Sequence, residues 1–369
     1  MEMSDRFLRA CRREPVDATP VWFMRQAGRY MPEYRAIREK YSLLEICQRP
    51  ELAAEVTLQP VRALGVDAAI LFADILLPAI PLGVGLKFAK GEGPVLLNPI
   101  RNLDDVKNLR PVNPESDLGY VMETIRILRE TLNGLPLIGF CGAPFTVASY
   151  LIEGGSSREF VKTKTMMYSA PGVWHALMEK LSDVLRDYLI AQIHTGAQAV
   201  QMFDSWVGVL SPMDYETFVL PYSQKVLQAA KKENVPTIHF GTTTATLLPL
   251  MKRAGSDVIG LDWRIHLDDG WKILGDDVAT QGNLDPAVLL APLPEIKRRV
   301  EDVLQRANGR AGHIFNLGHG ILQNTPVDHV KAVVDMVHEY SLSPRERVGV
   351  RKFSPLPQGE GLGVRGGTR

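Results

Sequence analysis

The sequence contains eight short apolar segments, and longer amphipathic segments separate them. The apolar segments comprise residues 20–24, 68–72, 136–140, 199–203, 237–240, 258–261, 278–281 and 313–317. None alternates cleanly between apolar and polar residues, which favours parallel strands covered on both faces over a half-exposed antiparallel sheet. Alternating strands and helices predict an α/β fold, and eight strands without a clear linker favour a single (β/α)8 TIM barrel. A doubly wound open sheet is the alternative.

The amphipathic segments have recognisable helix ends. Residues 171–196 begin with Pro171 and close at Gly196, which are the residue types preferred at the two ends of a helix. In residues 325–340, valines recur at helical spacing, and Thr325 is expected to cap the N-terminus. These patterns predict two of the helices that cover the barrel.

Glycines near residue 85 could suggest a dinucleotide-binding loop. Gly83 and Gly85 are followed by Gly91 and Gly93, but Pro94 interrupts the pattern before any helix. We therefore expect a glycine-rich hairpin here.

The end of the chain differs from the rest. Residues 344–369 contain six glycines, three prolines and no apolar periodicity, and six basic residues against two acidic ones give this segment a charge of +4. We expect a barrel domain over residues 1–343 and a disordered tail over residues 344–369.

Composition excludes several classes of protein. The 42 Lys and Arg residues balance 42 Asp and Glu residues, which argues against a nucleic-acid binder. The three cysteines, Cys11, Cys47 and Cys141, have no paired spacing, and we expect a cytoplasmic protein. Proline and glycine interrupt the longest uncharged stretch, so we expect no membrane span. The sequence has no P-loop, no H-E-x-x-H motif and no metal-ligand spacing.

Polar residues follow five of the apolar segments. Each of these residues comes shortly after a segment ends: Arg25, Asp74, Ser205, Asn283 and His319. Because the loops after the strands build the active site of a barrel, we expect these five side chains to gather at one mouth.

Two arginines flank a glycine directly after the first segment. Arg25 and Arg29, with Gly28 between them, are suited to bidentate binding of carboxylates. The alternative is that one or both form structural ion pairs with carboxylates of the barrel. Arg35 and Arg38 are typical of a solvated helix face and are not candidates.

Asp74 lies within residues 68–77, which are almost wholly apolar. An ionised carboxylate is costly in such a setting unless a partner pairs with it or donates hydrogen bonds to it. A cationic or N–H-rich ligand would be such a partner. A buried ion pair with Arg25 or Arg29 is the structural alternative.

Three further side chains are candidates with simple structural alternatives. His319 lies between Gly318 and Gly320, which let the backbone approach a ligand, although a satisfied loop histidine would have the same pattern. Tyr150 is by default a core residue, and Ser205 could cap a following helix.

Five motifs together resemble the uroporphyrinogen decarboxylase family. They occupy residues 20–30, 72–76, 142–146 with 150–155, 203–206 and 316–320, in the family's order. The resemblance implies a (β/α)8 barrel and a homodimer. It also implies an enzyme of haem and porphyrin biosynthesis that removes CO₂ from the four acetate side chains of uroporphyrinogen III to give coproporphyrinogen III. It implies no cofactor, since a pyrrole protonated on carbon serves as the electron sink.

The same resemblance assigns roles to individual residues. Asp74 would accept hydrogen bonds from pyrrole N–H groups and stabilise the cation; Arg25 would be a candidate proton donor; and His319 could take part in proton transfer. The substrate-binding residues that it implies are Arg25, Gln26, Ala27, Gly28, Arg29, Asp74, Tyr150, Phe203, Ser205 and His319.

Two other functions compete with this interpretation. A corrinoid-linked methyltransferase of the same superfamily would use a zinc thiolate site, but no cysteine follows Cys141. A non-catalytic tetrapyrrole-binding barrel would have no need of the cation-stabilising carboxylate of Asp74.

Overall fold

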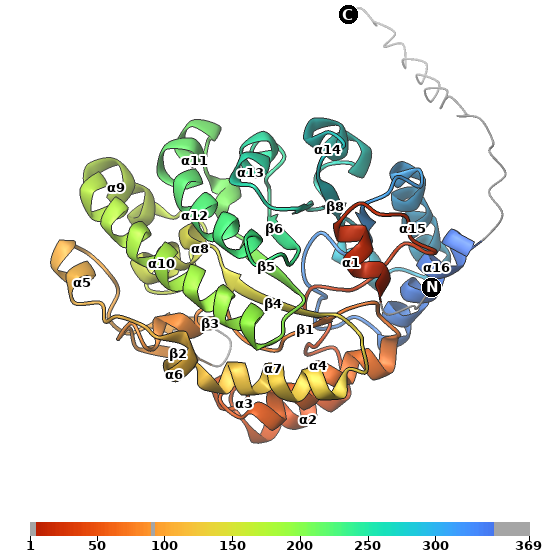
Figure 1. Cartoon of the computed structure of the whole chain (residues 1–369), viewed down its shortest axis with the longest axis horizontal. Coiled ribbons are helices and arrows are strands. Elements are labelled where there is room, and N and C mark those ends of the chain that lie inside the picture. Colours follow the sequence, from red (N-terminus) through yellow and green to blue (C-terminus); the bar gives the residue numbers. More distant parts are fainter. Residues whose placement is uncertain (1–4, 90–92, 343–369) are drawn as a thin grey trace, which may run out of the picture.

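The centre of the molecule is a curled sheet of parallel strands. The computed structural model describes residues 5–89 and 93–342, and Figure 1 shows the helices arranged around the strands. Each strand pairs in parallel with the next in the order β1-β4-β5-β6-β7-β8-β9. Their bounds are β1 (Ala69–Ile70), β4 (Leu137–Gly142), β5 (Ala199–Asp204), β6 (Thr237–Gly241), β7 (Val258–Gly260), β8 (Ala279–Gln281) and β9 (His313–Ile314).

The first apolar segment closes the sheet into a ring. Val21 forms a parallel bridge with Phe315, and the Phe315 N–H donates to the Pro20 carbonyl at 2.8 Å. On the other side, the Asp67 N–H donates to the Val21 carbonyl at 2.8 Å. Residues 20–24 therefore occupy the place of an eighth strand between β9 and β1. This closure confirms the predicted barrel and excludes the open doubly wound sheet.

The strands are buried on both faces, as their lack of alternation predicts. Every residue of β4 and of β6 is buried. A chain of polar side chains crosses the ring: Trp22 Nε1 donates to Gln281 Oε1, and Gln281 Nε2 donates to Gln201 Oε1, both at 3.0 Å. These bonds reduce the cost of burying the amide groups, although Gln201 Nε2 has no hydrogen-bond partner among the described residues.

The helices of the described residues form the outer layer (Figure 1). They are α1 (Arg6–Cys11), α2 (Pro32–Lys40), α3 (Leu43–Cys47), α4 (Pro50–Leu64), α5 (Leu103–Lys107), α6 (Pro114–Asp117), α7 (Gly119–Thr131), α8 (Pro144–Glu153), α9 (Val161–Ser169), α10 (Pro171–Thr195), α11 (Pro212–Phe218), α12 (Leu220–Lys231), α13 (Leu248–Ala254), α14 (Leu267–Leu274), α15 (Leu293–Ala307) and α16 (Val327–Leu342). Short 3₁₀ turns are η2 (Leu77–Ala79), η3 (Val207–Val209) and η4 (Pro286–Leu290).

The two helices predicted from their end signals are present. α10 begins at Pro171 and is followed by Gly196, whose φ of 126° suits only glycine. The prediction that Thr325 caps the N-terminus of α16 is wrong, however. The helix begins at Val327, and Thr325 Oγ1 is buried without a hydrogen-bond partner. The chain enters this helix one residue later than the Thr-Pro pattern suggests, which leaves the hydroxyl out of reach of the first helical N–H groups.

The glycine-rich segment forms the predicted hairpin. β2 (Leu86–Ala89) and β3 (Gly93–Leu96) pair antiparallel outside the barrel. The Leu96 N–H donates to the Gly154 carbonyl at 3.0 Å, which attaches the hairpin to the loop after α8.

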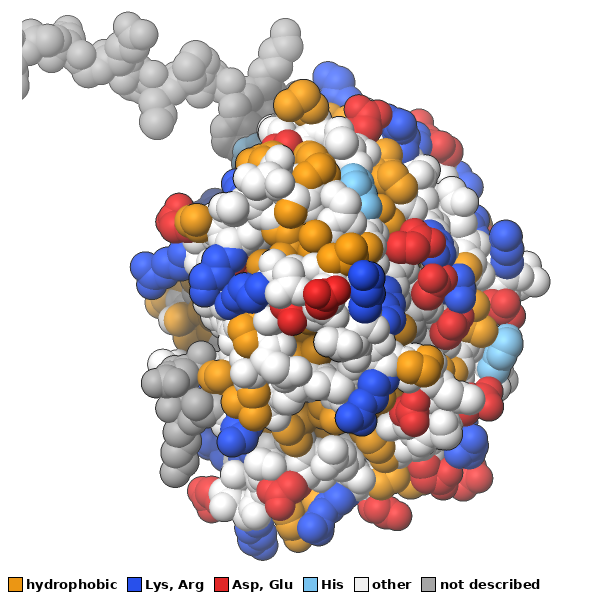
Figure 2. All heavy atoms as spheres, turned by 90° about the vertical axis from the view of Figure 1, so that its left-hand side faces the viewer, with side chains coloured by type: hydrophobic (Ala, Val, Ile, Leu, Met, Phe, Trp, Pro, Cys, Tyr) orange, Lys and Arg blue, Asp and Glu red, His pale blue; other side chains and the backbone are white. Residues whose placement is uncertain are grey.

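The outer surface carries both signs of charge. Figure 2 shows acidic and basic side chains interspersed over one face, with hydrophobic side chains between them. No helix of the described residues is long and apolar enough to cross a membrane. The predicted tail, residues 344–369, lies outside the described residues.

Candidate functional site

Side chains predicted for the site lie at the carboxyl ends of the barrel strands. Arg25 follows the eighth-strand segment, Asp74 follows β1, Ser205 follows β5 and His319 follows β9. Tyr150 comes from α8, which directly follows β4. Because parallel strands end at the same rim of a barrel, these residues share one mouth.

Arg25 has an unusual backbone that its neighbours hold in place. Its φ is 57°, in the left-handed region that non-glycine residues rarely adopt. The side chain lies against Gly320, where a Cβ atom would come within 2.4 Å of Arg25 Cδ. The glycine after His319 therefore makes room for the arginine, which explains this half of the Gly-His-Gly motif.

A buried asparagine joins the first and last loops of the mouth. Asn316 Oδ1 accepts from the N–H groups of Met24 at 3.1 Å and Leu317 at 2.8 Å. The Ile321 N–H donates to the Met24 carbonyl at 3.0 Å. Arg25 and His319 are thus held on two loops that hydrogen-bond to each other.

The loop that carries both arginines is braced from inside. The buried Gln26 side chain accepts from the Phe23 N–H and donates to the Ala68 carbonyl, both at 3.1 Å. Tyr30 Oη donates to the Gln26 carbonyl at 2.7 Å. At Gly28, a Cβ would lie 2.9 Å from the Arg25 carbonyl. Gln26 therefore fixes the loop with its side chain. Ala27 and Gly28 are half-buried, so their backbone groups are partly exposed at the mouth.

Arg35 has more contacts than a solvated helix face requires. Its Nη1 donates to the carbonyl groups of Arg29 at 2.9 Å and Tyr30 at 3.0 Å. It supports the arginine loop without belonging to the mouth.

Both mouth arginines are exposed and available to a ligand. Within residues 5–89 and 93–342, neither Arg25 nor Arg29 forms an ion pair. The alternative of structural ion pairs with barrel carboxylates is therefore wrong for the described residues. Two unpaired guanidinium groups make this rim locally basic, although the whole chain is neutral.

The Asp74 carboxylate is half-buried and sparsely bonded. Oδ1 accepts from the Leu76 N–H at 2.8 Å, and no cation of the described chain pairs with it. Burial raises the pKa of Asp74, while the Leu76 N–H and the positive charge of Arg25 act in the opposite direction. The predicted alternative, a buried ion pair with an arginine, is wrong. The carboxylate keeps capacity for further donors.

Tyr150 lies at the edge of the mouth and stacks on Trp206. The ring centroids are 3.8 Å apart with 32° between the planes. Burial raises the pKa of Tyr150 to about 12, and the nearby Asp74 carboxylate adds to this while Arg25 opposes it. The hydroxyl is therefore a neutral donor at physiological pH.

The end of β5 supplies an apolar wall and a hydroxyl. Half-buried Phe203 packs edge-on against Phe140 and Phe240, with centroids 5.4 Å and 6.1 Å away. Ser205 is half-buried, and its carbonyl accepts from Thr242 Oγ1. The alternative that Ser205 caps the next helical turn is wrong, because η3 has no side-chain cap.

His319 is held in one neutral tautomer. Its Nδ1 accepts from the Gly320 N–H at 2.6 Å, so Nε2 carries the proton. The pKa of His319 is lowered to about 4, mainly by burial and also by the positive charges of Arg25 and Arg264, while Asp262 acts in the opposite direction. The imidazole is therefore a neutral hydrogen-bond donor at pH 7.

Sequence reasoning missed two charged residues of this mouth and misplaced one neutral residue. Asp262 and Arg264 follow β7, and the same rule of polar residues after a strand could have found them. Asn283 is buried behind that loop, where Nδ2 donates to the carbonyl groups of Asp262 at 2.8 Å and Ile265 at 2.7 Å. The expectation that Asn283 joins the mouth is wrong, since its amide braces the neighbouring loop.

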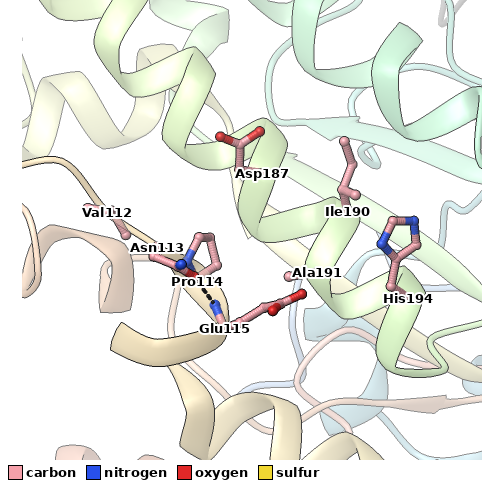
Figure 3. Close-up of a pocket in the computed structure, with 8 residues that line it drawn as sticks. All are labelled: Val112, Asn113, Pro114, Glu115, Asp187, Ile190, Ala191 and His194. Carbon is pink, nitrogen blue, oxygen red and sulfur yellow. Dashed lines mark hydrogen bonds between the residues drawn. The ribbon is translucent and has the colours of Figure 1, made fainter.

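A separate surface hollow lies away from these residues. Its volume is about 350 Å³, and Figure 3 shows that α10 and the segment around α6 line it. The α10 residues Asp187 and His194 lie near the helix end that leads into β5, at the amino end of the strands. With Glu115 and Asp187 in its wall, the hollow is unsuited to an acidic ligand.

Comparison with known proteins identifies the family. The family model described as uroporphyrinogen decarboxylase (URO-D) matches residues 2–340. The chain belongs to the uroporphyrinogen decarboxylase family. The uroporphyrinogen decarboxylase of Sorangium cellulosum is 60% identical over 337 residues, which cover 91% of this chain and 96% of the relative. That of Carboxydothermus hydrogenoformans is 57% identical over 340 residues, covering 92% and 97%.

Solved structures agree on the fold of this decarboxylase family member. A methyltransferase from Methanosarcina mazei superposes with a TM-score of 0.77 at 21% identity, covering 92% of this chain and 98% of its own. A B12-independent methionine synthase from Shewanella superposes with a TM-score of 0.54 at 12% identity, covering 79% and 89%. At these identities the likeness shows the fold alone. The family match includes all the residues of the mouth, whereas the methyltransferase alternative is not favoured.

Proposed function

We propose that this chain removes CO₂ from the four acetate side chains of uroporphyrinogen III and releases coproporphyrinogen III. Membership of the uroporphyrinogen decarboxylase family supports the reaction. The observation that carries the proposal is the half-buried, unpaired Asp74 carboxylate at a mouth whose exposed arginines have no ion pairs within the described residues. Such a site fits a ligand that presents N–H groups at its centre and carboxylates at its edge.

Loss of CO₂ leaves the electron pair of the broken C–C bond behind, and the reaction needs a group that accepts this pair. Protonation of a pyrrole carbon produces a cation that can accept the electron pair released when the neighbouring C–COO⁻ bond breaks. After CO₂ leaves, the exocyclic methylene carbon takes up a proton and the ring carbon loses the proton that it had gained. The pyrrole is thereby restored, and each acetate becomes a methyl group with the net uptake of one proton. The substrate itself is the electron sink, and we expect turnover without an added cofactor.

Asp74 is placed to stabilise the cation. Its free acceptor capacity can take pyrrole N–H groups, and the surrounding apolar residues keep the local dielectric low. A fixed negative charge in such a site stabilises developing positive charge more strongly than water does. The attraction between the carboxylate and the cation offsets the energetic cost of desolvating the carboxylate.

The other residues of the mouth hold the periphery of the substrate. Arg25 and Arg29 bind acidic side chains, and Arg25 is also a candidate proton donor. His319 offers Nε2–H, and Tyr150 and Ser205 offer hydroxyl donors. The backbone of the Gln26, Ala27 and Gly28 loop contacts the same carboxylates, while Phe203 packs against the ring.

We further propose that the enzyme is a homodimer and acts in the cytoplasm, with a barrel domain over residues 1–343 and a tail over residues 344–369. Sedimentation of the purified chain tests the dimer. A single species of monomer mass at micromolar concentration would contradict it.

Anaerobic incubation of the purified protein with uroporphyrinogen III tests the function. We expect coproporphyrinogen III and four equivalents of CO₂ without any addition. Tight binding of the tetrapyrrole with no release of CO₂ would contradict the enzyme and support a tetrapyrrole carrier.

A further inference from the structure

The loop after β7 presents a positive charge to the mouth over a buried counter-ion. Arg264 Nη1 lies 2.6 Å from Asp262 Oδ2, and the Arg264 N–H donates to Asp262 Oδ1 at 3.1 Å. The Asp262 side chain is 1% exposed, whereas that of Arg264 is 44% exposed. A ligand in the mouth therefore meets the guanidinium group and not the carboxylate.

The guanidinium group is held by its surroundings. Its carbon lies 4.0 Å from the centre of the Trp263 ring, a cation–π contact. Asp262 is fixed in turn, because its Oδ2 also accepts from the Thr243 N–H at 2.5 Å and its carbonyl accepts from Asn283. A side chain that is already ordered loses less entropy when it binds a ligand.

The same loop lies against the Gly-His-Gly loop. At Gly318, a Cβ atom would come within 2.4 Å of the Trp263 nitrogen, so only glycine allows this approach. This contact brings the loop that carries Arg264 against the loop that carries His319, and the positive charges of Arg264 and Arg25 both lower the pKa of that imidazole. Two guanidinium groups from different loops thus act on one side chain.

We propose that Arg264 binds a peripheral carboxylate of the substrate, as a third guanidinium group of the mouth beside Arg25 and Arg29. This inference rests on the proposed function, because it assumes a substrate with many carboxylates around its rim. Uroporphyrinogen III carries eight, and two arginines can grip only about two of them bidentately. The partly free donors of Arg264 extend that capacity to the β7 side of the barrel.

The test compares charge removal with charge retention. Arg264→Gln keeps an N–H donor for Asp262 and removes the positive charge, whereas Arg264→Lys keeps the charge but loses the planar fork. We expect Arg264→Gln to raise KM about tenfold with kcat within about twofold, and Arg264→Lys to raise KM about threefold. Arg298→Gln is the matched control, since Arg298 is exposed on α15 and bonded to Glu295. It should leave both constants unchanged.

Equilibrium binding separates this inference from the proposed reaction. Uroporphyrin, the oxidised form with the same eight carboxylates, serves as a probe that does not turn over. We expect Arg264→Gln to weaken its binding about tenfold, and added salt to narrow the difference. If the wild type binds the probe through Arg264 but releases no CO₂ from uroporphyrinogen III, the inference stands and the proposed function fails. If the wild type turns over and Arg264→Gln keeps wild-type KM and Kd, or loses only kcat, the inference is wrong.

Discussion

Two aspartates at opposite ends of one strand have opposite environments. Asp67 precedes β1 and is buried, where it accepts from the Val21 N–H at 2.7 Å, from Arg6 at 3.1 Å and from His338 at 2.8 Å. Asp74 follows β1, and its carboxylate accepts from the Leu76 N–H alone among the described residues. The carboxylate at the amino end of the strand is fully satisfied by the protein, whereas the one at the carboxyl end keeps its acceptors free.

The histidines of the last strand repeat this contrast. His313 begins β9 and is buried, with Nε2 bonded to the Gly282 carbonyl at 3.0 Å, while its Nδ1 is buried without a hydrogen-bond partner among the described residues. His319 follows β9 and keeps Nε2 free for a ligand. Asp67 and His313 at the amino end thus bond mainly within the protein, whereas Asp74 and His319 at the carboxyl end keep hydrogen-bonding capacity that we propose serves the substrate, a division that barrels commonly show.

The largest effect is expected for Asp74→Asn. We expect kcat to fall at least about 10³-fold, because the neutral amide no longer stabilises the cation in a site of low dielectric. The melting temperature should stay within about 2 °C, since asparagine keeps the acceptor for Leu76 and removes a desolvated charge. Anaerobic assay and thermal melting of the same preparation measure both. If the variant loses stability together with activity, the proposed difference between Asp74 and Asp67 is wrong.

Asp67→Asn is the matched change at the other end of β1. We expect the free energy of unfolding to fall by about 2 kcal/mol, because buried Arg6 loses a charged partner. Turnover per folded molecule should be unchanged. Urea unfolding and assay below the transition check this, and a large loss of kcat in the folded variant would show that the two ends are not separate.

The histidine pair predicts a pH dependence of stability. Burial lowers the pKa of both His313 and His319 to about 4. Between pH 6.5 and pH 4 the unfolded chain binds protons that the folded chain excludes, so the free energy of unfolding falls as the pH is lowered through this window. His313→Asn or His319→Asn should each reduce that fall by about 2 kcal/mol between pH 6.5 and 4.5. Denaturant titrations of the wild type and of each variant at pH 6.5 and 4.5 measure this change in the free energy of unfolding.

The two histidine variants should differ in activity. His319→Asn should reduce kcat/KM about tenfold, because the substrate loses a donor at Nε2, whereas His313→Asn should retain it. Equal activity losses would contradict the assignment of these residues to different ends.

The smallest effect is expected from removal of residues 344–369. Their composition predicts a segment outside the barrel, and neither end of the barrel should depend on it. Truncation after residue 343 should leave both kcat and the melting temperature unchanged. A drop of several degrees would show that the segment packs against the fold.

Much of the barrel could be predicted because its strands carry a local signal. Buried parallel strands are continuous apolar segments, and the polar residues that follow several of them mark the mouth, as Arg25, Asp74 and His319 illustrate. Local signals failed where one residue decides the geometry. Thr325 lies one position too early to cap α16, and Asn283 turns behind a loop instead of into the mouth.

Pairings between distant residues could not be predicted at all. The bonds of Asp67 reach Arg6 and His338, which are 61 and 271 positions away in the chain. In the same way, only the fold shows that Gly318 touches Trp263 and brings Arg264 to the mouth. The sequence patterns identify which residues face the mouth, and packing determines which of them already have a partner.

The most direct test of the account separates turnover from binding in Asp74→Asn. A carboxylate that stabilises a cation formed during the reaction contributes more to the transition state than to the bound substrate. Anaerobic kinetics with uroporphyrinogen III should therefore show a fall in kcat much larger than any rise in KM. Equal losses in kcat and in substrate affinity would show that Asp74 only positions the substrate.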